Sequence, residues 1–484
     1  GKVQTRISKT SRMTTENSKH AAEPYAYRNA RFEWQAPDVS KFKNRTFNGY
    51  HRSDGRVGTA NYWLFIPTVF CENRNLDVIR EALHNELGYA VTDKYKQYTK
   101  QLAEAYKNGI AVSGISFTPP SASEKARVRP FPNVEGIKFL NHQGGCGGIR
   151  QDAAILSKLL AAYANHPNVG GVTVLSLGCQ NLQVQDFKDD LKKLNPVFDK
   201  PFYIFEQQQS QSEEQLISEA IRKTFEGLMQ INMLERKPAT LDKLCIGVKC
   251  GGSDGFSGIS ANPSVGYCSD LVVALGGKIL LAEFPELCGV EQELIDRSVK
   301  EETAKKFIHL MHRFDELVTN AGSSFSMNPS PGNIKDGLIT DAMKSAGAAK
   351  KGGTSPVVDV LDYTEIATRP GLSLVCTPGN DVEATTGKAA SGATLILFTT
   401  GLGTPTGNPV CPTIKVSTNS NLTKRMNDII DIDCGPVIEG EKTIEQMGEE
   451  ILEYCIKAAS GEVIPKAVQL NQDDFIPWKR GVSL

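Results

Sequence analysis

Short apolar runs that break into glycine-rich turns recur along this chain. They lie at 137–142, 172–177, 244–248, 279–283, 372–377 and 395–400, and each is followed closely by glycine and by a reactive or ligating side chain. Runs of this length, mostly aliphatic and bounded by glycine, are typical of buried strands rather than helices. We therefore expect the loops after these strands to converge on a common site.

Longer amphipathic stretches alternate with the runs and predict helices over 92–109, 212–234, 289–316 and 444–459. Strand–helix alternation indicates a mostly parallel sheet with right-handed crossovers. Residues 1–47 are basic and polar, which predicts a linker or tail. We therefore predict an α/β protein with two α/β units: a first domain at 48–240, which could carry an oligomer interface, and a C-terminal domain at 241–484. The C-terminal domain is expected to be Rossmann-like, with a mostly parallel sheet flanked by helices, and to hold a metal site.

Composition narrows the class of protein. The chain has 484 residues, 40% of them apolar and 23% charged, which is typical of a globular protein with more than one core. A net charge of −1 gives no electrostatic reason to expect nucleic acid or an anionic membrane as a partner. The eleven cysteines include no close CxxC pair, so a disulfide framework or zinc finger is disfavoured and a reducing, cytoplasmic setting is expected.

The segment that begins at Cys250 carries the densest chemistry. Cys250, Ser253, Asp254 and Asn262 place a thiol, a hydroxyl, a carboxylate and an amide in one glycine-rich stretch after a predicted strand. Asp254 and Glu283 both follow strands and offer hard oxygen ligands for a divalent ion, although each could instead cap a helix or form a salt bridge. Ser253 and Asn262 are candidates for binding substrate.

An ordered set of motifs carries a family resemblance. The motifs are 47–58, the 142–146 loop, 177–179, 250–254, 328–333, 377–381 and 401–405. In this order they resemble the altronate/galactarate dehydratase family, and segments 283–292 and 479–484 resemble its altronate branch. Members of that family often begin with a small β-clip domain. None is visible here, so that domain is expected to be cut off or to be a separate polypeptide or subunit.

The resemblance implies a hydro-lyase that uses Fe²⁺, with Mn²⁺ as an alternative. It would convert D-altronate to 2-dehydro-3-deoxy-D-gluconate by metal-assisted removal of the α-proton and loss of the 3-hydroxyl. Galactarate or another 2-hydroxy acid is the alternative substrate, and a homo-oligomer (a dimer) is expected. A non-catalytic subunit and a nucleotide-dependent dehydrogenase are weaker alternatives, the latter because no G-x-G-x-x-G motif with a distant acidic residue opens a helix.

Three cysteines, Cys146, Cys179 and Cys250, lie just past predicted strands and abut glycine. They are either small buried apolar residues or thiolate ligands of iron. Three thiolates could hold an iron–sulfur cluster with one iron open to substrate. A mononuclear iron with mixed oxygen, nitrogen and sulfur ligands needs fewer assumptions and is the preferred hypothesis.

Proton transfer needs an acid and a base. Of seven histidines, His142 is the best candidate because it follows a strand and precedes glycine-rich backbone, and a buried structural histidine is the alternative. Lys415 lies among apolar neighbours in a strand and is the second catalytic candidate, as base or as carboxylate clamp, unless it points to solvent from an edge strand.

The remaining candidates for binding substrate lie in two loops. Gly401, Gly403 and Thr404 could bind the substrate carboxylate through backbone N–H groups. Asn380 and Asp381 could bind its hydroxyls, although such residues are also common in turns.

Overall fold

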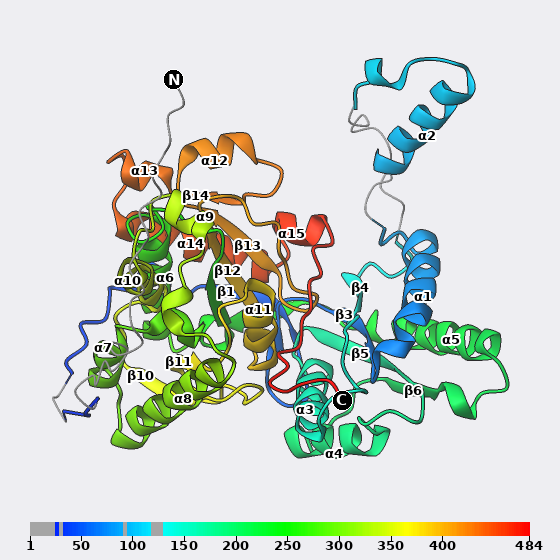
Figure 1. Ribbon diagram of the computed structural model, residues 1–484, viewed down its shortest axis with the longest axis horizontal. Coiled ribbons are helices and arrows are strands. Elements are labelled where there is room, and N and C mark those ends of the chain that lie inside the picture. The colour runs from blue at the N-terminus through cyan, green and yellow to red at the C-terminus, as the bar shows by residue number, and fades with distance from the viewer. Residues whose placement is uncertain (1–24, 29–31, 91–93, 118–128) are drawn as a thin grey trace, which may run out of the picture.

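The computed structural model describes residues 25–28, 32–90, 94–117 and 129–484. Two α/β bodies lie side by side, each built around its own parallel sheet (Figure 1). The predicted fold class is therefore confirmed. Every helix in the described part of the chain is too short or too polar to cross a bilayer.

The C-terminal body contains a seven-stranded sheet with the order β10-β11-β9-β8-β12-β13-β14, in which all neighbouring strands are parallel. The strands are β8 (Cys245–Cys250), β9 (Lys278–Ala282), β10 (Val357–Leu361), β11 (Gly371–Val375), β12 (Leu395–Thr400), β13 (Thr413–Ser417) and β14 (Ile432–Asp433). The central strands read as continuous apolar runs because helices cover both faces of a parallel sheet.

Ten helices of the described chain belong to this body. They are α6 (Ala261–Ala274), α7 (Glu291–Asp296), α8 (Glu301–Asn320), α9 (Pro331–Lys335), α10 (Asp341–Ala349), α11 (Asp381–Ala390), α12 (Ser420–Arg425), α13 (Gly435–Ile438), α14 (Ile444–Ala459) and α15 (Lys466–Gln469). Helix α14 begins where the sequence predicts because Thr443 and Gln446 form a capping box there.

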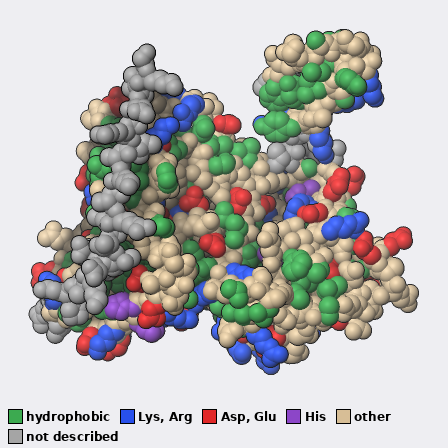
Figure 2. All heavy atoms as spheres, in the orientation of Figure 1, with side chains coloured by type: hydrophobic (Ala, Val, Ile, Leu, Met, Phe, Trp, Pro, Cys, Tyr) green, Lys and Arg blue, Asp and Glu red, His purple; other side chains and the backbone are tan. Residues whose placement is uncertain are grey.

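The first body contains a four-stranded parallel sheet with the order β4-β3-β5-β6. Its strands are β3 (Tyr62–Pro67), β4 (Gly136–Phe139), β5 (Val169–Ser176) and β6 (Phe202–Glu206), and its helices are α1 (Asn73–Glu86), α2 (Lys94–Lys107), α3 (Arg150–Ala164), α4 (Val184–Leu194) and α5 (Glu213–Ile231). Helix α2 projects from the body as an arm (Figures 1 and 2), and its Tyr95 and Tyr106 side chains are exposed.

A small antiparallel sheet, β2-β1-β7, joins the two bodies. The chain enters the first body through β1 (Thr46–His51), continues through β2 (Val57–Gly58), and leaves through β7 (Lys237–Thr240), which pairs with β1. Residues 1–24 and 29–31 of the predicted tail lie outside the described residues. Phe42 and Phe47, near its end, are buried in the C-terminal core.

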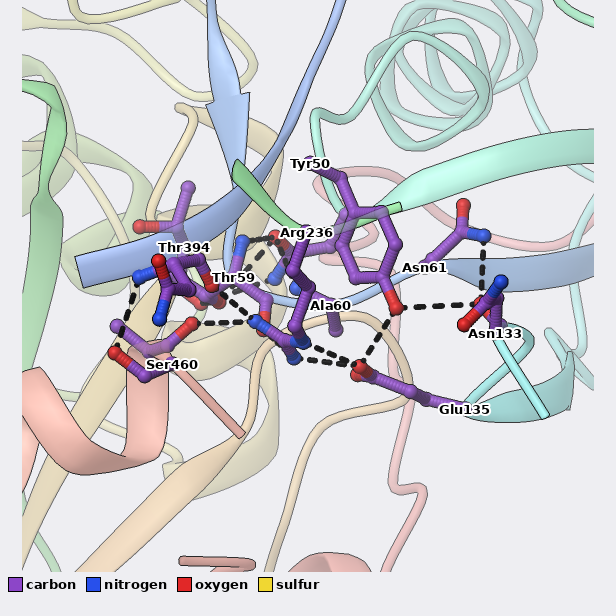
Figure 3. A network of polar contacts seen from close by, with 12 residues as sticks. Tyr50, Thr59, Ala60, Asn61, Asn133, Glu135, Arg236, Thr394 and Ser460 are labelled. Atoms are coloured by element: carbon purple, nitrogen blue, oxygen red, sulfur yellow. Dashed lines mark hydrogen bonds and ion pairs between the residues drawn. The ribbon is translucent and has the colours of Figure 1, made fainter. Parts of the chain in front are cut away.

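A polar network fixes this junction (Figure 3). The guanidinium of Arg236 donates to Glu135 Oε1 at 3.0 Å and to the carbonyl oxygens of Thr59 and Ala459. Tyr50 donates to the same carboxylate at 3.1 Å, and its ring lies 4.8 Å from the guanidinium. One arginine therefore links both bodies.

The apolar core also crosses the boundary between the bodies. One face of the seven-stranded sheet packs on helices α6, α8 and α14, through residues such as Leu271, Phe307 and Ile451. The opposite face shares a single cluster with the first body, in which Phe398 and Leu160 both take part. The C-terminal segment, red in Figure 1, runs from one body to the other.

One local prediction differs from the structure. The helix predicted over 289–316 is two helices, α7 and α8, because the chain turns at 297–300, where Ser298 forms a bridge with Val357. The helix predicted over 212–234 is α5, which buries Leu216, Ala220 and Leu228 and leaves Met229 exposed.

Candidate active site

The strand order of the seven-stranded sheet reverses between β8 and β12. Strands β9, β11 and β10 lie on one side of β8, and β12, β13 and β14 lie on the other. In open α/β sheets, ligands bind beyond the carboxyl ends of the strands at such a reversal. The loops found here are the 250–254 turn after β8 and the 401–404 turn after β12, with Glu283 directly after β9.

The buried carboxylate of Glu283 gathers lysines from three separate elements. Lys249 of β8 forms a short ion pair with it, Lys351 of the 3₁₀ turn Lys350–Gly352 lies at 3.1 Å, and Lys388 of α11 at 3.6 Å. All four side chains are fully buried. Glu283 has φ 75, a left-handed conformation that residues other than glycine rarely adopt. The surrounding structure therefore holds this carboxylate in a strained position, as is common at functional sites.

Some of the lysines near Glu283 have no hydrogen-bond partner within the described part of the chain. Lys249 also pairs with Asp381 at 2.9 Å, and the side chain of Asp381 is 30% exposed, so this end of the cluster reaches solvent. Lys415 of β13 lies close by, with its Nζ 3.6 Å from the centre of the Phe398 ring. The Nζ atoms of Lys388 and Lys415 have no hydrogen-bond partner among the described residues. Buried amino groups without a hydrogen-bond partner are costly, so the cluster is suited to receive an acceptor such as a carboxylate.

Burial changes the protonation of these lysines. It lowers the pKa of Lys415 to about 7, although the nearby carboxylate of Asp381 opposes the shift. Burial, together with repulsion from Lys249 and Lys351, lowers the pKa of Lys388 well below its ordinary value. An amine with a pKa near 7 is partly uncharged at neutral pH and can accept a proton.

A second buried ion pair adjoins the first group. Lys344 of α10 lies 3.1 Å from Glu286 and donates to Asn328 Oδ1 at 2.6 Å. Burial raises the pKa of Glu286, but attraction by Lys249, Lys344 and Lys351 outweighs it and lowers the pKa to about 2. Glu286 therefore stays ionised and offsets part of the positive charge.

The Asp254 carboxylate is already hydrogen-bonded within the protein. Its Oδ2 accepts from Thr418 Oγ1 at 2.9 Å and from Asn419 Nδ2 at 3.3 Å, while Oδ1 accepts from Ser257 Oγ at 3.0 Å. A Cβ at Gly401 would lie 2.2 Å from its Cγ, which explains glycine there. Asp254 therefore joins its own loop to residues 418–419 after β13 and packs against Gly401.

The predicted metal ligands are not gathered at one point. Cys250 is buried at the end of β8, with its Sγ 2.6 Å from Ser253 Oγ, whereas Cys146 and Cys179 are exposed in the first body. No three His, Cys, Asp or Glu side chains within the described ranges are arranged to hold a metal ion. Glu283 is instead paired with lysines. These side chains do not fit a single mononuclear iron site, and iron or manganese stays a prediction.

The turn after β12 does not offer the N–H groups predicted to bind a carboxylate. The Gly401 N–H donates to the Gly252 carbonyl at 3.0 Å, and the N–H groups of Gly403 and Thr404 donate to Thr400 Oγ1 at 3.0 and 3.2 Å. Because these donors are satisfied within the protein, positive charge at this sheet edge comes from lysine side chains instead.

Two other predicted substrate ligands stabilise the backbone. Asn262 donates to the Gly347 carbonyl at 3.0 Å and accepts from Thr399 Oγ1 at 2.6 Å. Asn380 caps α11 by accepting from two N–H groups of its first turn. Asp381 is partly exposed and paired with Lys249, so it is better placed to contact a substrate than Asn262 or Asn380.

His142 lies in the first body and is held by backbone groups. Its Nε2 lies 2.8 Å from the Pro67 carbonyl oxygen, and its Nδ1 accepts from the Gly144 N–H at 3.0 Å. Burial lowers its pKa to about 4, so the ring is neutral at neutral pH. With both ring nitrogens engaged, the geometry favours a structural role, and the acid–base role stays a prediction without structural support.

A cavity of about 570 Å³ lies where the two bodies meet. The 141–148 loop, the start of α3, Glu383 and the 475–479 segment line it. Glu383 and Asp381 share the first turn of α11, so the cavity lies beside the exposed end of the lysine cluster. Its volume is within the range of small-molecule sites.

Sequence reasoning identified Lys415 but missed Lys249, Lys351 and Lys388. The same signal was available for Lys249, because it stands in a strand whose other positions are buried and mostly apolar. Lys388 lies among small residues in α11, where burial depends on tertiary packing that the sequence pattern does not display.

Comparison with known proteins gives two family matches. Residues 49–232 match the family described as D-galactarate dehydratase/Altronate hydrolase, second domain, and residues 241–483 match D-galactarate/Altronate dehydratase, C-terminal. Altronate dehydratase of Bacillus subtilis (strain 168) is 35% identical over 91% of this chain and 79% of its own length. Altronate dehydratase of Escherichia coli (strain K12) is 38% identical over 90% of this chain and 78% of its own length. Galactarate dehydratase (L-threo-forming) of the same strain is 31% identical over 86% of this chain and 73% of its own length.

Replacing Lys415 with Met is expected to stabilise the fold below neutral pH. Burial lowers the pKa of Lys415 from 10.5 to about 7, so the unfolded chain binds the proton more tightly. The resulting penalty, on the order of several kcal/mol, is fully present below about pH 7 and disappears as the pH rises towards about 10.5. Urea unfolding at about pH 6 and about pH 9.5 measures the free energy of unfolding of Lys415→Met and of the wild type. The variant should be the more stable at about pH 6, and the difference should be smaller at about pH 9.5.

The exposed Lys424 provides the control, since Lys424→Met should change stability little at either pH. A Lys415→Met variant that is destabilised equally at both pH values would contradict the buried, poorly compensated lysine.

Proposed function

Because the chain belongs to the D-galactarate/altronate dehydratase family, we propose that it eliminates water from D-altronate to give 2-dehydro-3-deoxy-D-gluconate. Identity to the two altronate dehydratases is 35% and 38%, against 31% for the galactarate enzyme. Homology to hydro-lyases also speaks against a nucleotide-dependent dehydrogenase. The observation that carries the chemistry is the group of buried lysines beside Glu283, the residue that follows β9.

Substrate carboxylate binding is assigned to Lys388 and Lys351. Lys388 has an Nζ without a hydrogen-bond partner, and an anion beside it would favour its charged form. Removing the α-proton moves negative charge onto the carboxylate to form an enediolate. Fixed ammonium groups in a buried site stabilise that developing charge more than they stabilise the ground state.

Lys415 is the proposed base for the C2 proton. Its pKa of about 7 makes the neutral amine available, and its neighbour Phe398 provides no competing acceptor of hydrogen bonds. The C2–H bond breaks, the proton moves to Nζ, and the electron pair enters the enediolate.

Lys249 is the proposed acid for the leaving group. As an ammonium ion it is paired with Glu283 and Asp381, and Asp381 is the part of the cluster that reaches solvent. The enediolate electrons form the C2–C3 double bond, the C3–O bond breaks, and Lys249 protonates the departing hydroxyl as water. The resulting enol then tautomerises to the 2-keto acid.

A sugar-acid screen tests the substrate. D-altronate, galactarate and shorter 2-hydroxy acids are incubated with anaerobically purified protein, ferrous iron and a reductant, and 2-keto-3-deoxy products are measured. D-altronate should give the highest kcat/KM. Preferential turnover of galactarate would contradict the substrate assignment, and turnover of no sugar acid would contradict the proposed function.

Lys415→Arg tests the base, because arginine keeps the positive charge but cannot accept a proton. We expect kcat to fall by roughly 10²–10⁴-fold. Wild-type activity should decrease as the pH falls below about 7, where Lys415 becomes protonated, and the variant should lack this decrease. Exchange of the substrate C2 proton in D₂O should disappear in Lys415→Arg. In Lys249→Met, exchange should continue while elimination is lost.

Retention of C2 exchange by Lys415→Arg would remove Lys415 as the base. His142→Asn is the matched comparison. It should leave the pH profile unchanged if His142 is structural, as its two backbone hydrogen bonds indicate.

A further inference from the structure

Three of the eleven cysteines are exposed, and they stand at one edge of the first body's sheet. Cys71 lies in the 3₁₀ turn Phe70–Glu72 after β3, Cys146 follows β4, and Cys179 follows β5. These strands are neighbours in the order β4-β3-β5 and run parallel. Their carboxyl ends therefore lie together, and so do the loops that carry the three thiols.

Backbone hydrogen bonds tie these three loops to one another. The Phe70 N–H donates to the Gly144 carbonyl at 3.1 Å, which joins the loops of Cys71 and Cys146. The Leu182 N–H donates to the Gly145 carbonyl at 3.1 Å, which joins the loops of Cys146 and Cys179. Gly145 has φ 97, and a Cβ there would lie 2.1 Å from the Thr68 carbonyl oxygen. Glycine therefore allows the loops to pack as one patch.

Core packing accounts for the other cysteines but not for these. Of the remaining eight, seven are buried and Cys288 is partly buried, which is the usual environment of a free thiol. The exposed trio also has a polar contact: Gln208 Nε2 donates to Cys179 Sγ at 3.2 Å. Hydrogen bonds to ligand sulfur are one of the means by which proteins tune iron–sulfur centres.

We infer that Cys71, Cys146 and Cys179 bind a [4Fe–4S] cluster through three of its irons. The part of the chain that the structure describes contains no three ligands gathered for one ion. Thiolates on a cluster attach to different irons and therefore stand farther apart, and soft sulfur ligands are those that such clusters use. Each thiol loses its proton on binding.

The third thiolate of this ligand set is Cys71 and not Cys250, which the sequence had suggested. Cys250 is buried in the other body against Ser253. The fourth iron would have no cysteine ligand from this trio. Cys146 lines the cavity between the bodies, so that iron would face this cavity. The inference concerns cofactor binding and does not depend on which sugar acid is the substrate.

Cluster content tests the inference directly. The full chain is purified anaerobically and reconstituted with ferrous iron and sulfide, and iron, acid-labile sulfide and visible absorption are measured. About four irons and four sulfides per chain are expected. Cys71→Ser, Cys146→Ser and Cys179→Ser should each lose most of the sulfide and the absorption. Their exposed positions make these substitutions compatible with folding, which circular dichroism verifies.

Two control variants give the comparison. Cys288→Ser and Cys250→Ala should keep the full sulfide content. Iron without sulfide, zinc in its place, undiminished sulfide in Cys71→Ser, or loss confined to Cys250→Ala would each overturn the cluster. Sugar-acid turnover without any bound sulfide would overturn it while leaving the proposed function standing.

Discussion

The ion pairs between Glu283 and its three lysines are the interaction on which the candidate active site depends. Lys249, Lys351 and Lys388 come from a strand, a 3₁₀ turn and a helix, and only the folded sheet brings them to one carboxylate. Breaking a buried ion pair by removing one partner typically costs about 3–5 kcal/mol, because the remaining charge stays uncompensated. The site is therefore inseparable from the stability of this edge of the sheet.

The charge balance explains why the site can accept a carboxylate. Glu283, Asp381 and Glu286 compensate part of the charge of Lys249, Lys351 and Lys388. The Nζ atoms of Lys388 and Lys415 have no hydrogen-bond partner among the described residues. A second chemically distinct patch, the exposed thiols, lies in the first body. The shared apolar cluster and the Arg236 network hold the two bodies together, and the cavity lies between them.

Sequence patterns predicted β4 and β5 of the first sheet and β8, β9, β11 and β12 of the second, because buried parallel strands are continuous apolar runs bounded by glycine. They predicted α14 because its capping box is local, and they identified Lys415 because a lysine in an apolar strand is conspicuous. Local pattern did not separate α7 from α8, since the break at 297–300 depends on pairing with the distant Val357. The role of Lys388 was also inaccessible, because only tertiary packing shows that this helical lysine meets Glu283.

The most direct measurement is a crystal structure with a 3-deoxy sugar acid bound, which retains the carboxylate and 2-hydroxyl but has no leaving group. The ligand carboxylate should lie within hydrogen-bonding distance of Lys388, and C2 should lie next to Lys415 Nζ. A ligand whose carboxylate binds elsewhere, with the lysines around Glu283 unchanged and out of reach, would rule out the lysine cluster as the active site.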